Sequence, residues 1–165
     1  MKESVGEGAF ATVYKAIYEE KVVAVKILKI PKHQKKKQKT IMNEFRREVR
    51  VMSKFQHSCL VEIVGFSVSN PVALVMELLA YGDLYQFIHN PENEINWELR
   101  LRIAYDISRA MSFLHSLSPP LVHRDLKSPN IMLASKDPRA PAVAKVADFG
   151  LSQELLTSSL RGESA

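Results

Sequence analysis

The octapeptide HRDLKSPN, residues 123–130, is the most specific stretch of this sequence. Asp125 can accept a proton from a hydroxyl group or orient that hydroxyl, and Lys127 can neutralise charge on a phosphoryl group. Asn130 offers a neutral oxygen that can complete a magnesium site. Four chemically distinct residues at fixed offsets make a chance match a poor explanation. We expect His123, which opens the stretch, to be structural rather than catalytic.

A second motif, Asp148-Phe149-Gly150, follows the octapeptide after a stretch that is typical of a hairpin. The Asp148 carboxylate is a hard oxygen ligand, which suits a magnesium ion that bridges phosphate oxygens. Three such residues alone would be common by chance, but their place shortly after residues 123–130 is not. Together the two motifs predict a site for a metal and phosphate groups.

A glycine-rich stretch near the N-terminus predicts a phosphate-binding turn between two strands. Gly6 and Gly8 let backbone amides approach phosphate oxygens without obstruction from side chains. Lys26, in Val23-Ala24-Val25-Lys26, supplies a positive charge for the α- and β-phosphates. The glycine pair alone is weak evidence, because such turns occur in many hairpins. The expected phosphate-binding stretch comprises Val5, Gly6, Glu7, Gly8, Ala9, Phe10, Ala11, Thr12 and Val13.

The composition is that of a globular, water-soluble domain. The 165 residues are 46% hydrophobic and 25% charged, with a net charge of +5. No apolar run approaches the roughly 20 residues that cross a bilayer, and the N-terminus lacks the apolar core of a secretory signal. The single cysteine, Cys59, excludes an internal disulfide and fits a reducing compartment. We therefore expect a cytoplasmic protein without a transmembrane segment, and its oligomeric state stays open.

Much of the positive charge lies in one run, from Lys32 to Lys39, with His33 inside it. We interpret this basic run as a solvated helix face or loop. Contact with nucleic acid or an anionic membrane is the alternative. No aromatic residues are interleaved with the lysines and no nucleic-acid-binding motif surrounds them, so no nucleic-acid partner is expected.

The hydrophobic pattern predicts a small sheet with one helix, followed by a mainly helical segment that ends in hairpins. We expect strands around Val13 and over 22–28, 60–67, 72–76, 121–122, 131–133 and 144–146. Expected helices cover 40–54, a short segment capped by Asp83, and 97–115 capped by Asn96. The longest helix would bury a face formed by Leu99, Ile103, Ile107, Ala110, Met111 and Leu114.

In this order, the three motifs resemble those of the protein kinase catalytic domain. The resemblance covers essentially the whole chain and implies an α+β, two-lobed fold. A small β-rich N-lobe with one helix would span about 1–79, and a truncated, mainly helical C-lobe about 80–165. The third glycine of the family pattern is Ala11 here, which is a minor departure. Residues 136–142 and the lead-in 144–148 are most similar to Roco and leucine-rich-repeat kinases of the tyrosine-kinase-like group.

The kinase resemblance implies a catalytic set. Glu48 matches the helix glutamate that pairs with Lys26, and Glu44 is the rival candidate. Lys127 favours a serine/threonine kinase over a tyrosine kinase. The implied catalytic residues are Lys26, Glu48, Asp125, Lys127 and Asn130, and the implied metal ligands are Asn130 and Asp148.

The resemblance also implies a nucleotide pocket. Met76 matches the gatekeeper, after which Glu77 and Leu79 offer the backbone groups that hold adenine. Asp83 falls where a polar residue often meets the ribose. The adenine ring would be sandwiched by Val13, Ala24 and Met132.

The implied function is transfer of a phosphoryl group from ATP, with Mg²⁺, to serine or threonine of a protein substrate. The alternative is a truncated, inactive module that holds nucleotide or a partner. We interpret residues 1–165 as a partial kinase domain that ends in the activation segment. On that interpretation we expect the isolated chain to be inactive and its longest helix to present bare apolar residues to water. Candidate phosphorylation sites that would pair with Arg124 are Thr157, Ser158 and Ser159.

Overall fold

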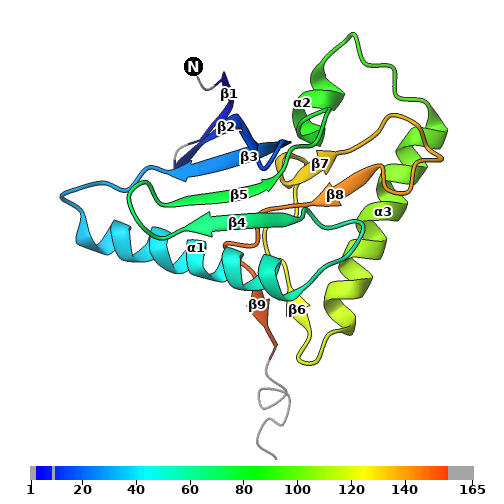
Figure 1. Cartoon of the computed structure of the whole chain (residues 1–165). Coiled ribbons are helices and arrows are strands. Elements are labelled where there is room, and N and C mark those ends of the chain that lie inside the picture. Colours follow the sequence, from blue (N-terminus) through cyan, green and yellow to red (C-terminus); the bar gives the residue numbers. More distant parts are fainter. Residues whose placement is uncertain (1–2, 9, 156–165) are drawn as a thin grey trace, which may run out of the picture.

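The computed structural model describes residues 3–8 and 10–155, and its N-terminal half is built on one antiparallel sheet (Figure 1). The strand order is β1-β2-β3-β5-β4. These strands are rich in β-branched and aromatic residues, which suit a half-buried pleated surface. Their bounds are β1 Glu3–Glu7, β2 Ala11–Tyr18, β3 Lys21–Leu28, β4 Ile63–Ser67 and β5 Ala73–Glu77.

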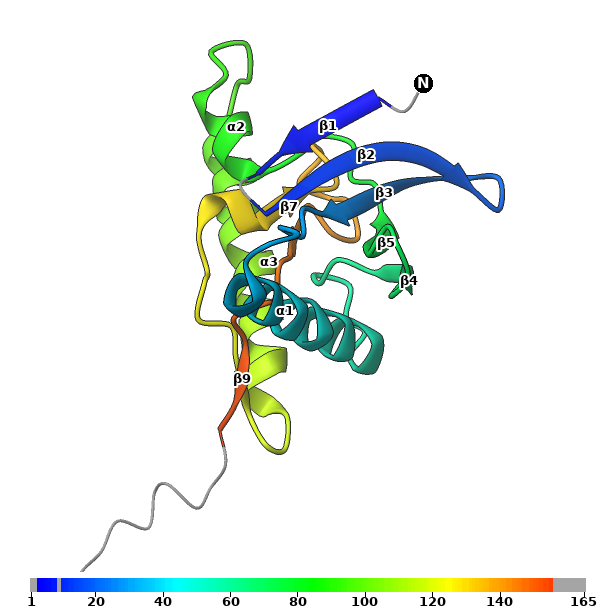
Figure 2. The same ribbon diagram turned by 90° about the vertical axis from the view of Figure 1, so that its left-hand side faces the viewer.

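A single long helix, α1 (Lys35–Lys54), lies under this sheet (Figure 2). It buries Ile41, Phe45, Glu48, Val51 and Met52. The predicted start at residue 40 was wrong, because the lysine run provides no apolar face to signal a helix. Lysine nevertheless has a good intrinsic helix propensity, so the helix begins five residues earlier.

The C-terminal half contains two helices and short strands. Helix α2 (Leu84–His89) is capped by Asp83, whose Oδ1 accepts a hydrogen bond from the Gln86 amide at 2.9 Å. Helix α3 (Trp97–Ser116) is capped by Asn96, whose Oδ1 accepts from the Leu99 amide at 2.8 Å. Both predicted caps are confirmed. The remaining elements are β6 Leu121–Val122, the 3₁₀ turn η1 Ser128–Asn130, β7 Ile131–Leu133, β8 Ala144–Val146 and β9 Gln153–Glu154.

Helix α3 packs against β8 and β6, and most of its predicted apolar face is covered. Four residues of that face are buried, Leu99, Ile103, Ala110 and Leu114, while Ile107 and Met111 are half-buried. The predicted buried face is therefore confirmed for these four residues, and the bare apolar residues expected on this helix are others. The opposite side of α3 exposes Trp97, Leu101 and Tyr105 instead.

One hydrophobic core joins the two halves. The predicted strand over 60–67 begins only at Ile63, because Val61 turns toward the second half and donates its amide to the Val146 carbonyl at 3.0 Å. Val146 in turn donates to the Cys59 carbonyl at 2.8 Å. The core cluster includes Met52 of α1, Leu74 of β5 and Leu133 of β7, so both halves share it.

Among residues 3–8 and 10–155, no helix has the length and apolar character needed to cross a bilayer. Thr157, Ser158, Ser159 and Ala9, which were assigned roles from the sequence, lie outside the described residues.

Candidate active site

A cavity of about 300–1,000 Å³ is usual for a small-molecule site, and a cavity of about 730 Å³ opens between the sheet and the second half. It receives most of the residues that sequence analysis assigned to a nucleotide. The assigned residues that line it are Val5, Gly6, Val13, Ala24, Lys26, Glu48, Glu77, Leu79, Asp83, Asn130, Met132 and Asp148. The expected gatekeeper Met76 lines it as well. Further lining residues, for which no role was predicted, include Lys15, Val22, Val61 and Gln86.

Part of the glycine-rich stretch lies outside this lining, namely Glu7, Gly8, Phe10, Ala11 and Thr12. Gly6 belongs to β1 rather than to a turn, which corrects the predicted position of the turn. The Glu7 carboxylate points to Lys29, with Oε1 2.6 Å from Nζ. Gly8 donates its amide to the Ala11 carbonyl at 2.9 Å, which closes the turn between β1 and β2.

Lys26 and Glu48 form a paired charge at the back of the cavity. The Lys26 Nζ lies 2.8 Å from Glu48 Oε1 and 2.9 Å from Oε2. Asp148 Oδ1 lies farther from the same amine, at 3.9 Å. No hydrogen bond joins Lys26 to Glu44 among the described residues, so the structure brings Glu48, the favoured candidate, to the lysine.

Burial and charge act on this pair in opposite directions. Burial alone would lower the pKa of Lys26, but the negative charges of Glu48 and Asp148 outweigh it and raise that pKa. Lys26 is therefore a cation at neutral pH. Burial raises the pKa of Glu48, and the adjacent Lys26 ammonium acts against this rise.

The octapeptide brings its three polar side chains together. Lys127 Nζ lies 2.9 Å from Asp125 Oδ1 and 2.8 Å from Oδ2. Asn130 Nδ2 donates to Asp125 Oδ2 at 2.9 Å and to the Asp125 carbonyl at 2.8 Å. Hydrogen bonds from Lys127 and then Asn130 lower the pKa of Asp125, so its carboxylate stays ionised and accepts hydrogen bonds.

Two residues of the site hold left-handed backbone conformations, which are unfavourable for side chains other than glycine. Arg124 has φ 65° and Asp148 has φ 63°. Arg124 is held by a 2.7 Å hydrogen bond from its Nε to the Leu151 carbonyl and by a second one to the Gln153 side chain. These two contacts hold Arg124 in its unfavourable conformation, directly before Asp125, and Asp148 lines the cavity in the same backbone conformation.

Contacts of α1 fix the segment that follows Asp148. Arg47 donates to the Gly150 carbonyl at 3.1 Å. A Cβ atom at position 150 would make ordinary contacts, 3.5 Å from the Glu44 Cβ and 3.4 Å from Asp148 Oδ1, so Gly150 packs against α1 without an unusually close approach. Helix α1 thus contacts the metal-ligand motif as well as Lys26.

His123 is fully buried between the two polar motifs. Its Nε2 lies 3.0 Å from the Ala147 carbonyl, and its ring centroid lies 5.0 Å from that of Phe149. The side chain is thus engaged in packing and hydrogen bonding, which agrees with the structural role expected for it.

Sequence analysis missed a role for the Glu77 side chain. Its carboxylate accepts hydrogen bonds from Lys145 Nζ at 2.6 and 2.8 Å and from the Glu62 amide at 2.8 Å. This carboxylate connects β5 to the start of β4 and to β8. No local signal predicts the pair, because Glu77 and Lys145 are far apart in the sequence.

The oxygen atoms of Asp148 and Asn130 fit a magnesium ion by their chemistry. The Asp148 side chain is 45% exposed, so its carboxylate is accessible from the cavity. Asn130 donates its amide nitrogen to Asp125, which leaves its oxygen as the atom that can bind a metal. Among residues 3–8 and 10–155, no group of three or more His, Cys, Asp and Glu side chains is placed to hold a metal ion.

Fold and site together define a kinase catalytic domain: an antiparallel sheet with one helix, a lysine–glutamate pair, and two polar motifs around one cavity. The family model for protein tyrosine and serine/threonine kinases matches residues 1–164. The chain belongs to this family.

Similar proteins also carry kinase names. The probable serine/threonine-protein kinase pats1 of Dictyostelium discoideum is 45% identical over 98% of this chain, which is 5% of that protein. Roco6 of the same organism is 44% identical over 95% of this chain and 7% of its own length. CTR1 of Arabidopsis thaliana is 37% identical over 100% of this chain and 19% of its length. The similarity to Roco kinases is confirmed, and the chain spans a small fraction of each relative.

Proposed function

We propose that this chain carries the site for ATP-dependent phosphoryl transfer to serine or threonine of a protein substrate. One observation carries the proposal: the Lys26–Glu48 pair, Asp148 and Asn130 line a single cavity. Asn130 is hydrogen-bonded to Asp125, so the cavity continues directly into the octapeptide. Relatives named as serine/threonine kinases support the class of acceptor.

Each residue has a distinct task in this proposal. The Lys26 ammonium, fixed by Glu48, binds the α- and β-phosphates and keeps its charge because its pKa is raised. The Asp125 carboxylate orients the acceptor hydroxyl and takes its proton as the oxygen attacks the γ-phosphorus and the bond to the β-phosphate oxygen breaks. Lys127, which already contacts Asp125, offsets charge on the transferring group.

Asp148 and Asn130 would hold Mg²⁺, which neutralises phosphate charge and orients the nucleotide when bound. The adenine ring would lie between Val13, Ala24 and Met132, against the backbone of Glu77 and Leu79. All five of these residues line the same cavity as Lys26. Asp83 also lines it, but its Oδ1 already caps α2, which leaves Oδ2 for a ribose hydroxyl.

A cytoplasmic location belongs to the same proposal. Cys59 is buried and unpaired with sulfur among the described residues, and burial raises the pKa of its thiol. A neutral, buried thiol fits a reducing compartment.

The direct test uses a complete kinase domain that contains residues 1–165, and it measures transfer of labelled γ-phosphate to peptides that contain serine and threonine, or tyrosine only. We expect transfer to the first set, and Asp125→Asn should reduce the rate by about 10²–10⁴-fold because it removes the proton acceptor. Asp137→Asn is a matched control, since Asp137 is exposed in the β7–β8 connection and contacts only local groups.

Two results would argue against the proposal. Transfer by the Asp125→Asn variant at the wild-type rate would remove Asp125 from its role. Binding of ATP without transfer to any acceptor would favour the alternative function, a module that holds nucleotide and does not catalyse.

A further inference from the structure

Helix α1 carries a continuous basic stripe on its solvent side. Lys35, Lys39, Arg46 and Arg50 are all exposed. With about 3.6 residues per turn, their spacing places all four within a sector of about 60°. The helix has 20 residues and is therefore about 30 Å long, so the stripe extends along most of one side of the N-terminal half.

This charge contributes little to the fold. No acidic side chain lies within 4.0 Å of the four cations in the described part of the chain. The first turn of α1 contains no acid, and Gln34 provides no side-chain cap. Lysines at this end face the positive pole of the helix dipole, which is unfavourable. The fold therefore gives no reason for the stripe.

Exposed apolar side chains lie on and just after β4, the edge strand next to α1. Phe66 is 54% exposed, and Val68, two residues farther along the chain, is exposed as well. Phe66 is paired with Leu74, which is paired with Lys26, and the Lys26 amine contacts Glu48 of α1. Opposed residues in a sheet point to the same face, so Phe66 points to the α1 side. Figure 1 shows β4, at the sheet edge, running alongside α1.

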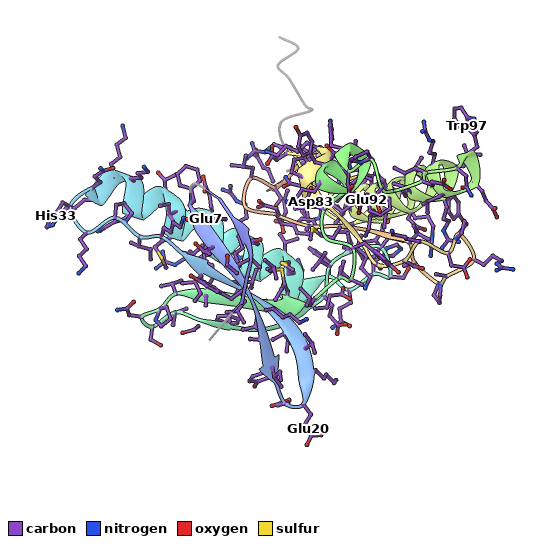
Figure 3. All side chains as sticks on the ribbon, turned by 90° about the horizontal axis from the view of Figure 1, so that it is seen from above. Glu7, Glu20, His33, Asp83, Glu92 and Trp97 are labelled. Carbon is purple, nitrogen blue, oxygen red and sulfur yellow. The ribbon has the colours of Figure 1, made fainter. Side chains whose placement is uncertain are left out.

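A cavity of about 500 Å³ adjoins the N-terminal end of the stripe. It is lined by Phe10, Gln34, Lys35, Lys36, Lys37, Thr40, Ile41 and Glu44. Figure 3 places His33, just before α1, at the outer end of the molecule, so this end is open to a large partner. Three lysines against one acid give this lining a net positive charge, which suits an anionic headgroup.

We propose that α1 and β4 form a docking surface for an anionic membrane. Clusters of four to eight Lys and Arg residues beside exposed apolar side chains are typical of such binding. Lysine-rich, dispersed charge suits a fluid layer of headgroups better than the fixed acids of one protein partner. Nucleic acid is disfavoured, because among the described residues Phe10 is the one aromatic ring in contact with a lysine of the 32–39 run, and Lys37 already lies 5.6 Å from its ring centroid.

Vesicle sedimentation tests the proposal. The purified protein is mixed with phosphatidylcholine vesicles that contain either no anionic lipid or phosphatidylserine, over a series of salt concentrations. We expect binding only to anionic vesicles and a steep loss with salt. A third set, with a phosphoinositide at equal total charge, distinguishes a phosphate site in the cavity from diffuse attraction.

A triple variant, Lys35→Gln with Lys39→Gln and Arg50→Gln, should weaken binding on the order of a hundredfold, at about fivefold per cation removed. Glutamine has a helix propensity close to that of lysine and arginine, so α1 remains folded. The matched control neutralises three exposed cations elsewhere, Lys21→Gln, Arg100→Gln and Arg139→Gln, and should bind nearly as wild type. Phe66→Ser should weaken binding about tenfold.

Several outcomes would overturn the proposal. These are equal binding to neutral vesicles, equal losses in the triple variant and its control, or no vesicle binding at all. Tight binding of polyglutamate or of RNA without vesicle binding would also overturn it, in favour of a protein or nucleic-acid partner.

Discussion

Glu48→Gln provides the sharpest test of how the cavity is built. The substitution keeps the size of the side chain and removes its charge. Among the described residues, Asp148 is then the one acid within 4.0 Å of the Lys26 amine, at 3.9 Å instead of the 2.8 Å of Glu48. The Lys26 and Glu48 side chains are only 19% and 6% exposed, so water replaces little of the lost interaction.

The expected magnitude follows from this burial. Breaking a buried ion pair by removing one partner costs about 3–5 kcal/mol. The glutamine oxygen can still accept one hydrogen bond from Lys26, so we expect the lower end, about 3 kcal/mol. For a domain of this size that corresponds to a fall in Tm of about 6–12 °C. Transfer should fall by about a hundredfold or more, because Lys26 is no longer fixed toward the phosphates.

Thermal unfolding followed by circular dichroism measures the stability, and titration with a fluorescent ATP analogue measures nucleotide binding. Glu44→Gln is the matched control on the same helix, since Glu44 makes no hydrogen bond to Lys26 among the described residues. A further variant, Lys26→Met with Glu48→Leu, replaces the pair by apolar groups. It should recover most of the lost stability but not nucleotide binding, which separates packing from charge.

Equal losses of Tm and nucleotide affinity in Glu44→Gln and Glu48→Gln would contradict the expectation that Glu48 is the residue that fixes Lys26. Wild-type binding of the ATP analogue by the Lys26→Met, Glu48→Leu variant would show that the Lys26 ammonium has no role in holding phosphate.

Three further changes test other parts of the site. Asp148→Asn should raise the Mg²⁺ concentration needed for half-maximal transfer, since an amide carries no charge to offset the metal; an unchanged Mg²⁺ titration would exclude Asp148 as a principal ligand. Lys127→Met removes the contact that most lowers the pKa of Asp125, so that pKa should rise. The acid limb of the kcat/KM profile should then move to higher pH. An unchanged acid limb would exclude Asp125 as its source. Asp106→Asn should lower the free energy of unfolding in urea by about 1.5–3 kcal/mol. The cause is its buried carboxylate, which accepts hydrogen bonds from the Val143 and Ala144 amides at 2.7 and 3.2 Å. An unchanged urea midpoint would contradict this expectation.

Local signals in the sequence were sufficient for several elements. The caps Asp83 and Asn96 act on amides three residues away, so their effect is visible in a short window. The short strands over 121–122, 131–133 and 144–146 have the predicted bounds, because each begins and ends with an aliphatic residue and lies beside turn residues. The glutamate that reaches Lys26 was favoured correctly in its position, although its catalytic role remains a proposal.

Other features depend on partners distant in the sequence. Asp106 lies on the buried face of α3, and its carboxylate accepts hydrogen bonds from two backbone amides at the end of the β7–β8 connection. The local sequence around Asp106 does not indicate these two partners. Strand β9 was not predicted, because only its pairing with β6 makes Gln153 and Glu154 a strand. The early start of α1 was missed because the lysines of its first turn face water. They therefore produce no periodic pattern of apolar residues that would predict a helix.

These distant contacts form a continuous path from α3 to the proposed metal site. Arg102 donates to the Pro138 and Pro141 carbonyls, both at 3.1 Å, and Asp106 holds the amides where β8 begins. Strand β8 then leads to Ala147, whose amide donates to the Asn130 carbonyl at 2.9 Å. Asp148 is the next residue, so its position relative to Asn130 is fixed by hydrogen bonds on both sides of β8. The β7–β8 connection, residues 134–143, is the part that resembles Roco kinases, and α3 thus holds its end next to β8. We therefore expect that its length can vary without moving the two proposed metal ligands, Asn130 and Asp148.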